Sequence, residues 1–397
     1  MNKLNPRQSE AVRYADGPML VLAGAGSGKT SVITRKIAYL IEQLGIPGRH
    51  IAAVTFTNKA AREMKERVGR IVDRKLTRGL IVSTFHNLGL NMIREEHTHL
   101  GYHPGFSIFD AEDAKALLQD LMLREASAEA GDELNDIQMT ISSWKNAMRG
   151  PAEALSKAAD EREQRIAIIY KKYNEYLKAY NAVDFDDLIL LPVMLFRSNP
   201  DVLAKWRRKI RYMLVDEYQD TNVCQYELVK QLVAERAAFT VVGDDDQSIY
   251  AWRGARPENL AQLKEDFPSL KIVKLEQNYR STARILRSAN TVIANNPHVF
   301  EKALWSDHTI GEEIRIIRCR NEDAETERVA TEILDQKLKN GLDFRDFAVL
   351  YRGNHQARLL EMKLQAYQIP YRISGGQSFF SKNEIKDAMS YLRLMIN

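Results

Sequence analysis

Short apolar runs alternate with segments of helical periodicity along most of this chain. Residues 19–22 form a continuous apolar run, and from Lys29 onward apolar residues recur near helical spacing as far as Leu44. Further apolar runs occupy residues 50–56, 80–84, 210–215, 239–243 and 271–275. Strands that are apolar throughout are buried on both faces, which is typical of parallel sheets covered by helices. The pattern therefore predicts an α/β domain with a parallel sheet, assembled from residues 1–88 and 187–280.

The strand pattern stops between residues 89 and 186, where helical periodicity predicts an all-helical insertion. Its aromatic residues have the spacing of side chains that pack between helices, which we favour over ligand stacking: Trp144, Tyr170, Tyr173, Tyr176 and Tyr180. The acidic turn at 184–187 resembles a carboxylate metal site, but a helix-capping turn is the interpretation we favour.

A second α/β segment is predicted for residues 281–374. It has strands at 313–318, 347–351 and 370–374 and helices at 324–339 and 355–367. Gly375 and Gly376 form a hinge-like break, and residues 375–397 are predicted to begin a further subdomain.

Composition is that of an ordinary globular protein, with 45% hydrophobic and 28% charged residues among 397. No apolar run has the length of a membrane span and the N-terminus has no apolar signal region, so a cytoplasmic location is expected. Two cysteines, Cys224 and Cys319, provide neither a disulfide framework nor a metal cluster.

The charge is distributed unevenly. Residues 1–88 carry 15 Lys and Arg against 6 Asp and Glu, a net +9, whereas residues 89–186 carry 11 against 18, a net −7. Eight of the basic residues lie between Lys59 and Arg78. The basic part predicts a polyanion that docks near it, although a solvated basic face accounts equally well for residues 59–78.

The apolar run 19–22 leads into AGAGSGKT at residues 23–30, the pattern of a phosphate-binding loop. Glycines at 24, 26 and 28 let backbone N–H groups approach a phosphate chain, and the helix that follows supplies aligned donors. Lys29 is placed for the β and γ phosphates and Thr30 for Mg²⁺. The strict pattern begins with Gly, where this chain has Ala23.

Acidic and amide side chains follow the later apolar runs. Asp216 is a candidate Mg²⁺ ligand and Glu217 a candidate base that polarises the attacking water. Gln247 is placed to contact a γ-phosphate, while Tyr250, Trp252 and Arg253 suit stacking on exposed bases, with an ordinary core as the alternative. On residue type alone, Gln8 and Arg280 are better explained as surface residues than as an adenine contact and an arginine finger.

Seven ordered motifs together resemble those of superfamily I DNA helicases of the Rep, UvrD and PcrA group. They are Gln8, AGAGSGKT (23–30), VTFTNKAAREM (54–64), STFH (83–86), VDEYQD (215–220), VVGDDDQSIYAWRGA (241–255) and QNYRS (277–281). The resemblance covers all 397 residues. It implies two RecA-like domains, ATP hydrolysis in the cleft between them, and movement 3′ to 5′ along single-stranded DNA with duplex unwinding. Ala23 is also the usual variant in this group.

The resemblance assigns roles by motif position. For ATP binding it implies Gln8, Ala23, Gly24, Ala25, Gly26, Ser27, Gly28, Lys29, Thr30, Tyr279 and Arg280, with Thr30 and Asp216 on Mg²⁺. For catalysis it implies Lys29, Glu217, Gln247 and Arg280. For DNA it implies Phe56, Thr84, His86, Tyr250, Trp252, Arg253, Arg352 and Asn354.

One departure from the group concerns its last motifs, which supply a second arginine and further DNA contacts and which this chain, ending at Asn397, lacks. The alternative function is therefore a nucleotide- and single-strand-binding module with weak or no motor activity. Expected partners are single-stranded DNA and its junctions with duplex, with a homodimer or replication and repair proteins as further candidates. A nuclease-linked recombination helicase would need additional catalytic domains.

Overall fold

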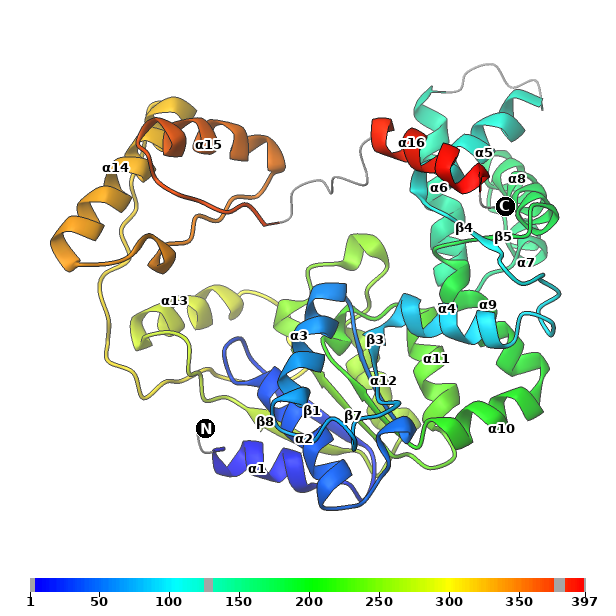
Figure 1. Cartoon of the computed structure of the whole chain (residues 1–397), viewed down its shortest axis with the longest axis horizontal. Helices are drawn as coiled ribbons and strands as arrows, with labels where there is room; N and C mark the ends of the chain where they lie inside the picture. Colours follow the sequence, from blue (N-terminus) through cyan, green and yellow to red (C-terminus); the bar gives the residue numbers. More distant parts are fainter. Residues whose placement is uncertain (1–3, 125–130, 375–382, 396–397) are drawn as a thin grey trace. The chain divides into compact units, whose positions relative to one another are not determined.

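The computed structural model describes residues 4–124, 131–374 and 383–395. The chain divides into two compact units, Met1–Glu312 and Glu313–Asn397. The first unit contains a six-stranded sheet in the order β3-β2-β6-β7-β1-β8, and every pairing in it is parallel (Figure 1). The α/β class and the parallel sheet expected from the apolar runs are confirmed.

The six predicted strands are all present, each within two residues of its expected bounds. They are β1 (Met19–Ala23), β2 (Ile51–Thr55), β3 (Ile81–Thr84), β6 (Tyr212–Val215), β7 (Phe239–Gly243) and β8 (Lys271–Leu275). Each of these runs is apolar enough to be recognised without a partner, and the neighbours in the sheet then supply its hydrogen bonds.

Helices cover both faces of the sheet. Along β1, Leu20 and Leu22 join one core cluster while Met19 and Val21 join the other, because successive strand residues point to opposite faces. One face is covered by α1 (Pro6–Arg13), α2 (Lys29–Glu42) and α3 (Asn58–Gly69). The other is covered by α4 (Phe85–Glu95), α9 (Asp187–Ser198), α10 (Pro200–Lys209), α11 (Val223–Val233) and α12 (Glu258–Asp266).

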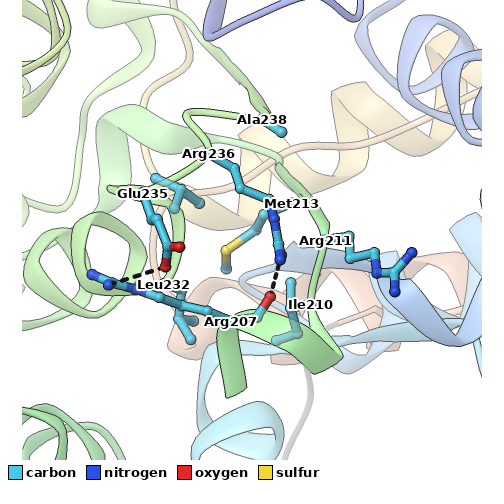
Figure 2. A pocket seen from close by; sticks show the side chains of 9 residues that line it. Arg207, Ile210, Arg211, Met213, Leu232, Glu235, Arg236 and Ala238 are labelled. Atoms are coloured by element: carbon cyan, nitrogen blue, oxygen red, sulfur yellow. Dashed lines mark hydrogen bonds and ion pairs between the residues drawn. The ribbon is translucent and has the colours of Figure 1, made fainter. Parts of the chain in front are cut away.

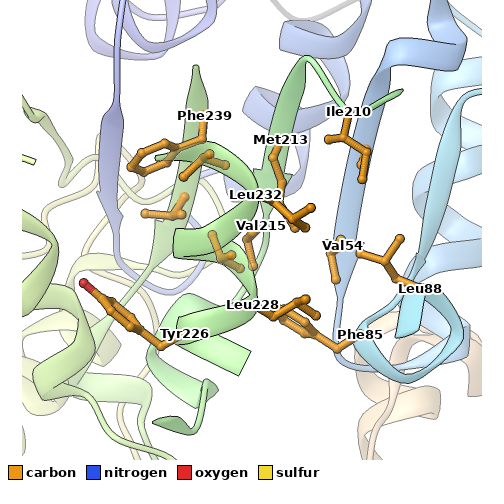
Figure 3. Packing of buried hydrophobic residues seen from close by; sticks show 14 of the residues in the cluster. Val54, Phe85, Leu88, Ile210, Met213, Val215, Tyr226, Leu228, Leu232 and Phe239 are labelled. Carbon is orange, nitrogen blue, oxygen red and sulfur yellow. The ribbon is translucent and has the colours of Figure 1, made fainter. Parts of the chain in front are cut away.

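Figure 3 shows the second of these layers, where Leu228 of α11 and Phe85 of α4 lie near Val54 and Val215 of the sheet. All four side chains are at most 1% exposed. Full burial of such a side chain contributes roughly 1.5–3 kcal/mol. The layer therefore holds the strand ends in fixed positions.

The described residues of the insertion form four helices and a small sheet. The helices are α5 (Ala111–Arg124), α6 (Gly131–Asn146), α7 (Pro151–Ser156) and α8 (Glu161–Ala179). β4 (Ser107–Phe109) and β5 (Ala182–Asp184) pair in parallel, so the prediction that the insertion is all-helical is wrong. Three-residue strands are too short to show a periodicity, and they form because the two ends of the insertion are brought together.

The aromatic residues of the insertion belong to its core, as expected. Trp144, Tyr170 and Tyr173 are buried in one cluster and Tyr176 packs against it, whereas Tyr180 is 53% exposed. The acidic turn is occupied by a buried lysine: Lys145 Nζ lies 2.7 Å from carboxylate oxygens of both Asp184 and Asp187.

The second unit contains α14 (Glu322–Asn340), α15 (Ala357–Ala366) and α16 (Asn383–Leu394). The first two match the expected helices and share a small core around Ala330 and Leu364. The strands expected at 313–318, 347–351 and 370–374 are absent from the described residues, so these predictions are wrong. An apolar run becomes a strand only where another strand accepts its hydrogen bonds, and here Ile316 and Leu350 are about nine-tenths exposed.

The remaining described elements are α13 and six short 3-10 helices. They are η1 (Gly48–His50), η2 (Tyr218–Asp220), η3 (Asp245–Gln247), η4 (Ala251–Arg253), α13 (Ala283–Ile293), η5 (Phe344–Asp346) and η6 (Asn354–Gln356). The expected hinge at Gly375 and Gly376 lies outside the described residues. None of the described helices combines the length and apolar character needed to cross a membrane. The first compact unit runs to Glu312, and the expected boundary at 280/281 stays a prediction.

Candidate nucleotide and DNA sites

Four candidate motifs begin where strands of the main sheet end. The phosphate-binding loop follows β1, Asp216 follows β6, Asp244 follows β7 and Glu276 follows β8. Because the sheet is entirely parallel, all four strand ends lie at one edge. The fold thus brings together segments that are more than 250 residues apart in the sequence.

The loop between β1 and α2 has the geometry of an anion cradle. Gly26 and Gly28 have φ angles of +69° and +89°, which side chains other than glycine rarely adopt. Gly28 caps α2 without a side-chain hydrogen bond, so the first backbone N–H groups of the helix are not capped by a side chain. Ser27 Oγ donates to the carbonyl of Gly24 at 2.7 Å and steadies the turn. These free donors fit a phosphate chain.

The glycines are also required by protein neighbours, which the sequence did not indicate. A Cβ at Gly24 would lie 2.2 Å from Leu304, one at Gly26 would lie 2.6 Å from Asn278, and one at Gly28 would lie 2.8 Å from Gln8. The loop is therefore enclosed by other motifs even before any ligand approaches it.

Lys29 is the centre of the polar cluster at the strand ends. Its Nζ donates to Glu217 Oε2 at 2.8 Å and to Gln247 Oε1 at 3.4 Å. Gln219 adds a link, since its Nε2 donates to Glu217 at 3.0 Å and its Oε1 accepts from the backbone N–H of Asp244 at 3.0 Å. The structure brings together three of the four predicted catalytic residues, and adds Gln219, whose only sequence signal was its place within VDEYQD.

Asp216 is 6% exposed, and its Oδ1 accepts from the backbone N–H of Glu217 at 3.1 Å. Burial, with a contribution from Glu217, raises the pKa of the Asp216 carboxyl to about 6, although Lys29 acts in the opposite direction. Among the described residues no basic side chain forms an ion pair with Asp216. A buried carboxylate without a cation fits a divalent metal ligand.

Glu217 has a φ of +50°, an unusual backbone conformation for a residue with a side chain. Such conformations persist where the surroundings impose them and are enriched at functional sites. Here the conformation accompanies the contact between the Glu217 carboxylate and Lys29.

The predicted adenine contacts also lie beside the loop. Gln8 is 5% exposed and its Nε2 donates to the carbonyl of Ser27 at 2.9 Å. The backbone N–H of Tyr279 donates to the carbonyl of Gly26 at 3.0 Å, and the Tyr279 ring is 45% exposed. Arg280 follows directly, with its Cβ next to Gly26 and its side chain exposed. The surface-helix interpretation of Gln8 is wrong, because the residue is buried against the loop.

Three of the predicted DNA residues lie at the ends of β2 and β3. The Phe56 ring packs against the Phe85 ring in a tilted arrangement with centroids 5.4 Å apart, and Thr84 caps α4 by accepting from the N–H of Asn87. The His86 ring lies edge-on to Phe185, and burial lowers its pKa. His86 is therefore neutral near pH 7 and offers a ring surface and a hydrogen-bonding atom, not a charge.

The other predicted DNA residues fall in two places. Tyr250 and Trp252 lie at η4, where they are 39% and 66% exposed, so the alternative of an ordinary core is excluded for both. Arg253 ends the same turn. Arg352 and Asn354 belong to the second unit and are exposed.

Two cavities of the first unit lie away from these residues. The one in Figure 2, of about 10 Å³, is lined by Arg207, Met213 and Arg236, and is closed by an ion pair between Arg207 and Glu235. A groove of about 620 Å³ is lined by Arg49, Lys75 and Arg78, which lie where β2 and β3 begin. Part of the basic segment thus lies at the sheet edge opposite the phosphate-binding loop.

A glycine-rich cradle at β1 that faces a lysine and acidic residues from neighbouring strands defines an α/β nucleotide-binding domain of the P-loop class. Residues 4–268 match the UvrD/REP helicase N-terminal domain and residues 273–397 match the UvrD-like helicase C-terminal domain. The chain belongs to the UvrD/REP helicase family.

Its similarity to individual relatives extends over its whole length. It is 56% identical over 396 residues to ATP-dependent DNA helicase Rep of Escherichia coli (strain K12), covering 100% of this chain and 58% of that protein. It is 42% identical over 397 residues to ATP-dependent DNA helicase PcrA of Staphylococcus aureus (strain Mu50 / ATCC 700699), covering 100% and 54%. The chain thus spans less than two thirds of the length of these relatives.

Proposed function

We propose that this chain binds ATP with Mg²⁺ and single-stranded DNA, and that it forms part of an ATP-driven DNA helicase moving 3′ to 5′. The observation that carries the proposal is the convergence of Lys29, Glu217 and Gln247 beside a glycine-rich loop whose helix has no side-chain cap. The family and the relatives named ATP-dependent DNA helicase support it.

In this proposal nucleotide binding exchanges the partner of Lys29. The Lys29 ammonium now neutralises Glu217, and phosphate oxygens would take over that contact. Glu217 would then be released to orient the attacking water, while the Gln247 amide would contact the γ-phosphate. Gln219 is hydrogen-bonded to both Glu217 and the backbone of Asp244, so it would hold the segments that follow β6 and β7 in fixed positions relative to each other.

Thr30 and Asp216 would hold Mg²⁺, which neutralises charge on the phosphate oxygens when it is bound. Gln8 and Tyr279 would fix the adenine, given their contacts with the neighbouring loop residues Ser27 and Gly26. Arg280 follows Tyr279 and would place positive charge near the transferred phosphoryl group.

Single-stranded DNA would lie along the strand ends that carry Phe56, Thr84 and His86, with bases stacked on Tyr250 and Trp252. Exposed aromatic rings bind bases of any kind, which suits a motor that reads no sequence. Arg253 and, in the second unit, Arg352 and Asn354 would add backbone contacts.

The first test is steady-state ATP hydrolysis by residues 1–397 with and without a single-stranded oligonucleotide. We expect stimulation by DNA, and loss of at least about 100-fold in kcat for Lys29→Ala, because a phosphate-binding cation is removed. Lys209→Ala, an exposed lysine paired with Glu95 on α4, is the matched control. Undiminished hydrolysis by Lys29→Ala would contradict the site.

The same assay decides between the motor and the alternative, a nucleotide- and DNA-binding module with weak or no turnover. The absence of strands from the described residues of 313–397 favours that alternative for the chain on its own. Binding of Mg-ATP and DNA without DNA-stimulated turnover would establish the module, whereas strong stimulation rules it out.

A further inference from the structure

Lys302 is a buried cation in the loop after α13, a position that no motif drew attention to. Its side chain is 4% exposed, and its Nζ lies 2.7 Å from Asp244, 2.6 Å from Asp245 and 2.7 Å from Asp246. Burial alone would lower the pKa of Lys302, but the three carboxylates raise it. Lys302 therefore stays charged and neutralises the acidic triplet that follows β7.

One of these carboxylates connects Lys302 to the nucleotide site. Asp244 presents Oδ1 to Lys302, while its Oδ2 accepts a hydrogen bond from Gln247 Nε2. The opposite end of the Gln247 amide, Oε1, faces Lys29 at 3.4 Å. Because Asp244 as a carboxylate can only accept, it fixes which end of the amide points to Lys29.

Without Lys302, Asp244 would be a carboxylate that is 2% exposed and has lost its cation. Without Lys302 the Asp244 carboxylate loses the contact that holds its Oδ1, so it no longer fixes the Gln247 amide in one orientation. A flipped amide would turn its NH₂ group toward the Lys29 ammonium, where two donors oppose each other. The orientation of Gln247 thus depends on a lysine 55 residues further along the chain.

The segment that carries Lys302, residues 298–305, also holds the Arg280 motif. At one end the backbone N–H groups of Val299 and Phe300 donate to Asp245. At the other end Trp305 accepts from the N–H of Asn278 at 2.7 Å, and Asn278 Oδ1 accepts from the N–H of Arg280. We call residues 298–305 the strap, since it ties the segment after β7 to the segment after β8.

We propose that Lys302 is a positioning residue for ATP hydrolysis: through Asp244 it orients the Gln247 amide toward the γ-phosphate, and the strap couples this orientation to Arg280. The inference rests on the proposed function. Asp245, Asp246 and His298 also have the spacing of a metal cluster, but the Lys302 ammonium already lies among the carboxylates.

The test compares Lys302→Met, Lys302→Arg and Asp244→Asn with the wild-type chain. We expect Lys302→Met to lower kcat about 10- to 100-fold, because the Gln247 amide is no longer oriented toward the γ-phosphate. Lys302→Arg keeps the cation and should recover most of the loss. Asp244→Asn leaves Lys302 two carboxylates, so it should fold, and it should reproduce the kcat loss.

A double-variant cycle separates positioning from a structural role. In a Gln247→Ala background there is no amide to orient, so Lys302→Met should cost less than about twofold in kcat. Lys230→Met removes a Lys–Asp pair of similar length, 2.8 Å to Asp266, and should keep wild-type kcat. The proposal is overturned by an equal loss in both backgrounds, or by wild-type kcat in both Lys302→Met and Asp244→Asn.

A binding assay keeps the inference testable apart from turnover. The ratio of Kd for ADP to Kd for AMP-PNP, each with Mg²⁺, reports contact with the γ-phosphate and should fall at least about fivefold in Lys302→Met and Asp244→Asn. If the wild-type chain binds AMP-PNP but hydrolyses no ATP, the motor function fails and an unchanged ratio in the variants still overturns the role of Lys302. A wild-type chain that binds neither nucleotide overturns both proposals.

Discussion

At the scale of single residues, the nucleotide site is held by charges that compensate one another without ligand. Lys29 is paired with Glu217, and Lys302 with the triplet that begins at Asp244. Asp216 is the exception, because it is buried and forms no ion pair within the described part of the chain, and the pKa of its carboxyl is raised to about 6. A group with this property makes the free protein less stable while it prepares the site for a metal ion.

Asp216→Asn should therefore stabilise the metal-free chain above pH 6. The folded-state pKa lies above the ordinary value of 3.8, so the native state holds the proton more tightly and the cost of the charge is fully present only above about pH 6. We expect a gain of about 1–3 kcal/mol in the free energy of unfolding at pH 7.5, disappearing near pH 4.

Thermal unfolding at pH 7.5 and pH 4.5 without Mg²⁺ measures this. Asp201→Asn, at an exposed residue of α10, is the control and should change the melting temperature little at either pH. A melting temperature of Asp216→Asn at or below that of the wild type at pH 7.5 would show that the buried charge is compensated by other groups.

At the scale of elements, prediction succeeded where the signal is local and failed where it depends on a partner. The run at 239–243 is apolar throughout and is a strand with these same bounds. The run at 347–351 is also apolar throughout but forms no strand in the described chain, since pairing and not composition decides. The mixed run at 313–318, EIRIIR, forms none there either. β4 and β5 were missed for the opposite reason, because tertiary contact creates strands too short to have a pattern.

The residues of the candidate site could likewise be predicted where the signal is local and not where it depends on the fold. Lys29, Glu217 and Gln247 could be predicted, since each stands in a motif whose spacing carries its chemistry. Lys302 and Lys145 could not, because a lysine in a polar stretch normally has a solvated ammonium, and only the fold shows that both are buried among aspartates.

Lys145 offers a prediction at the scale of the insertion. Its side chain is fully buried and joins α6 to the acidic turn that leads into α9. Lys145→Met leaves Asp184 and Asp187 buried without a cation and should lower the free energy of unfolding of the insertion by about 3–5 kcal/mol.

Urea unfolding followed by tryptophan fluorescence, to which Trp144 in the core of the insertion contributes, reports the change. The triple variant Lys145→Met, Asp184→Asn, Asp187→Asn removes all three charges and should recover most of the stability. If Lys145→Met alone unfolds at the wild-type urea concentration, the ion pairs contribute little.

At the scale of the whole molecule, basic residues and exposed aromatic rings would make two separate contributions to the proposed DNA binding. Residues 1–88 have a net charge of +9 and the exposed rings of Tyr250 and Trp252 lie in the segment after β7. Phosphate contacts lose strength as salt rises, whereas stacking does not depend on released counterions. The two contributions to DNA binding can therefore be measured separately.

We expect Trp252→Ala to weaken binding of a single-stranded oligonucleotide by about 1–3 kcal/mol at every salt concentration, with the slope of log K against log salt unchanged. Fluorescence anisotropy of labelled oligonucleotides of two unrelated sequences measures this. Trp206→Phe, a buried residue of α10, is a control for tryptophan replacement away from η4. Wild-type affinity of Trp252→Ala for the oligonucleotides would contradict the proposal that bases stack on Trp252.

The ladder between β2 and β6 joins Ile51 to Tyr212 across 161 residues of chain. Closing so long a loop is entropically unfavourable and slow, yet most of it consists of an insertion with its own core. If the insertion folds first, it shortens the effective loop. The connectivity therefore predicts that the insertion folds before β2 pairs with β6. Pulse-labelled hydrogen exchange should find the amides of α8 protected before those of β2, and simultaneous protection would contradict this order.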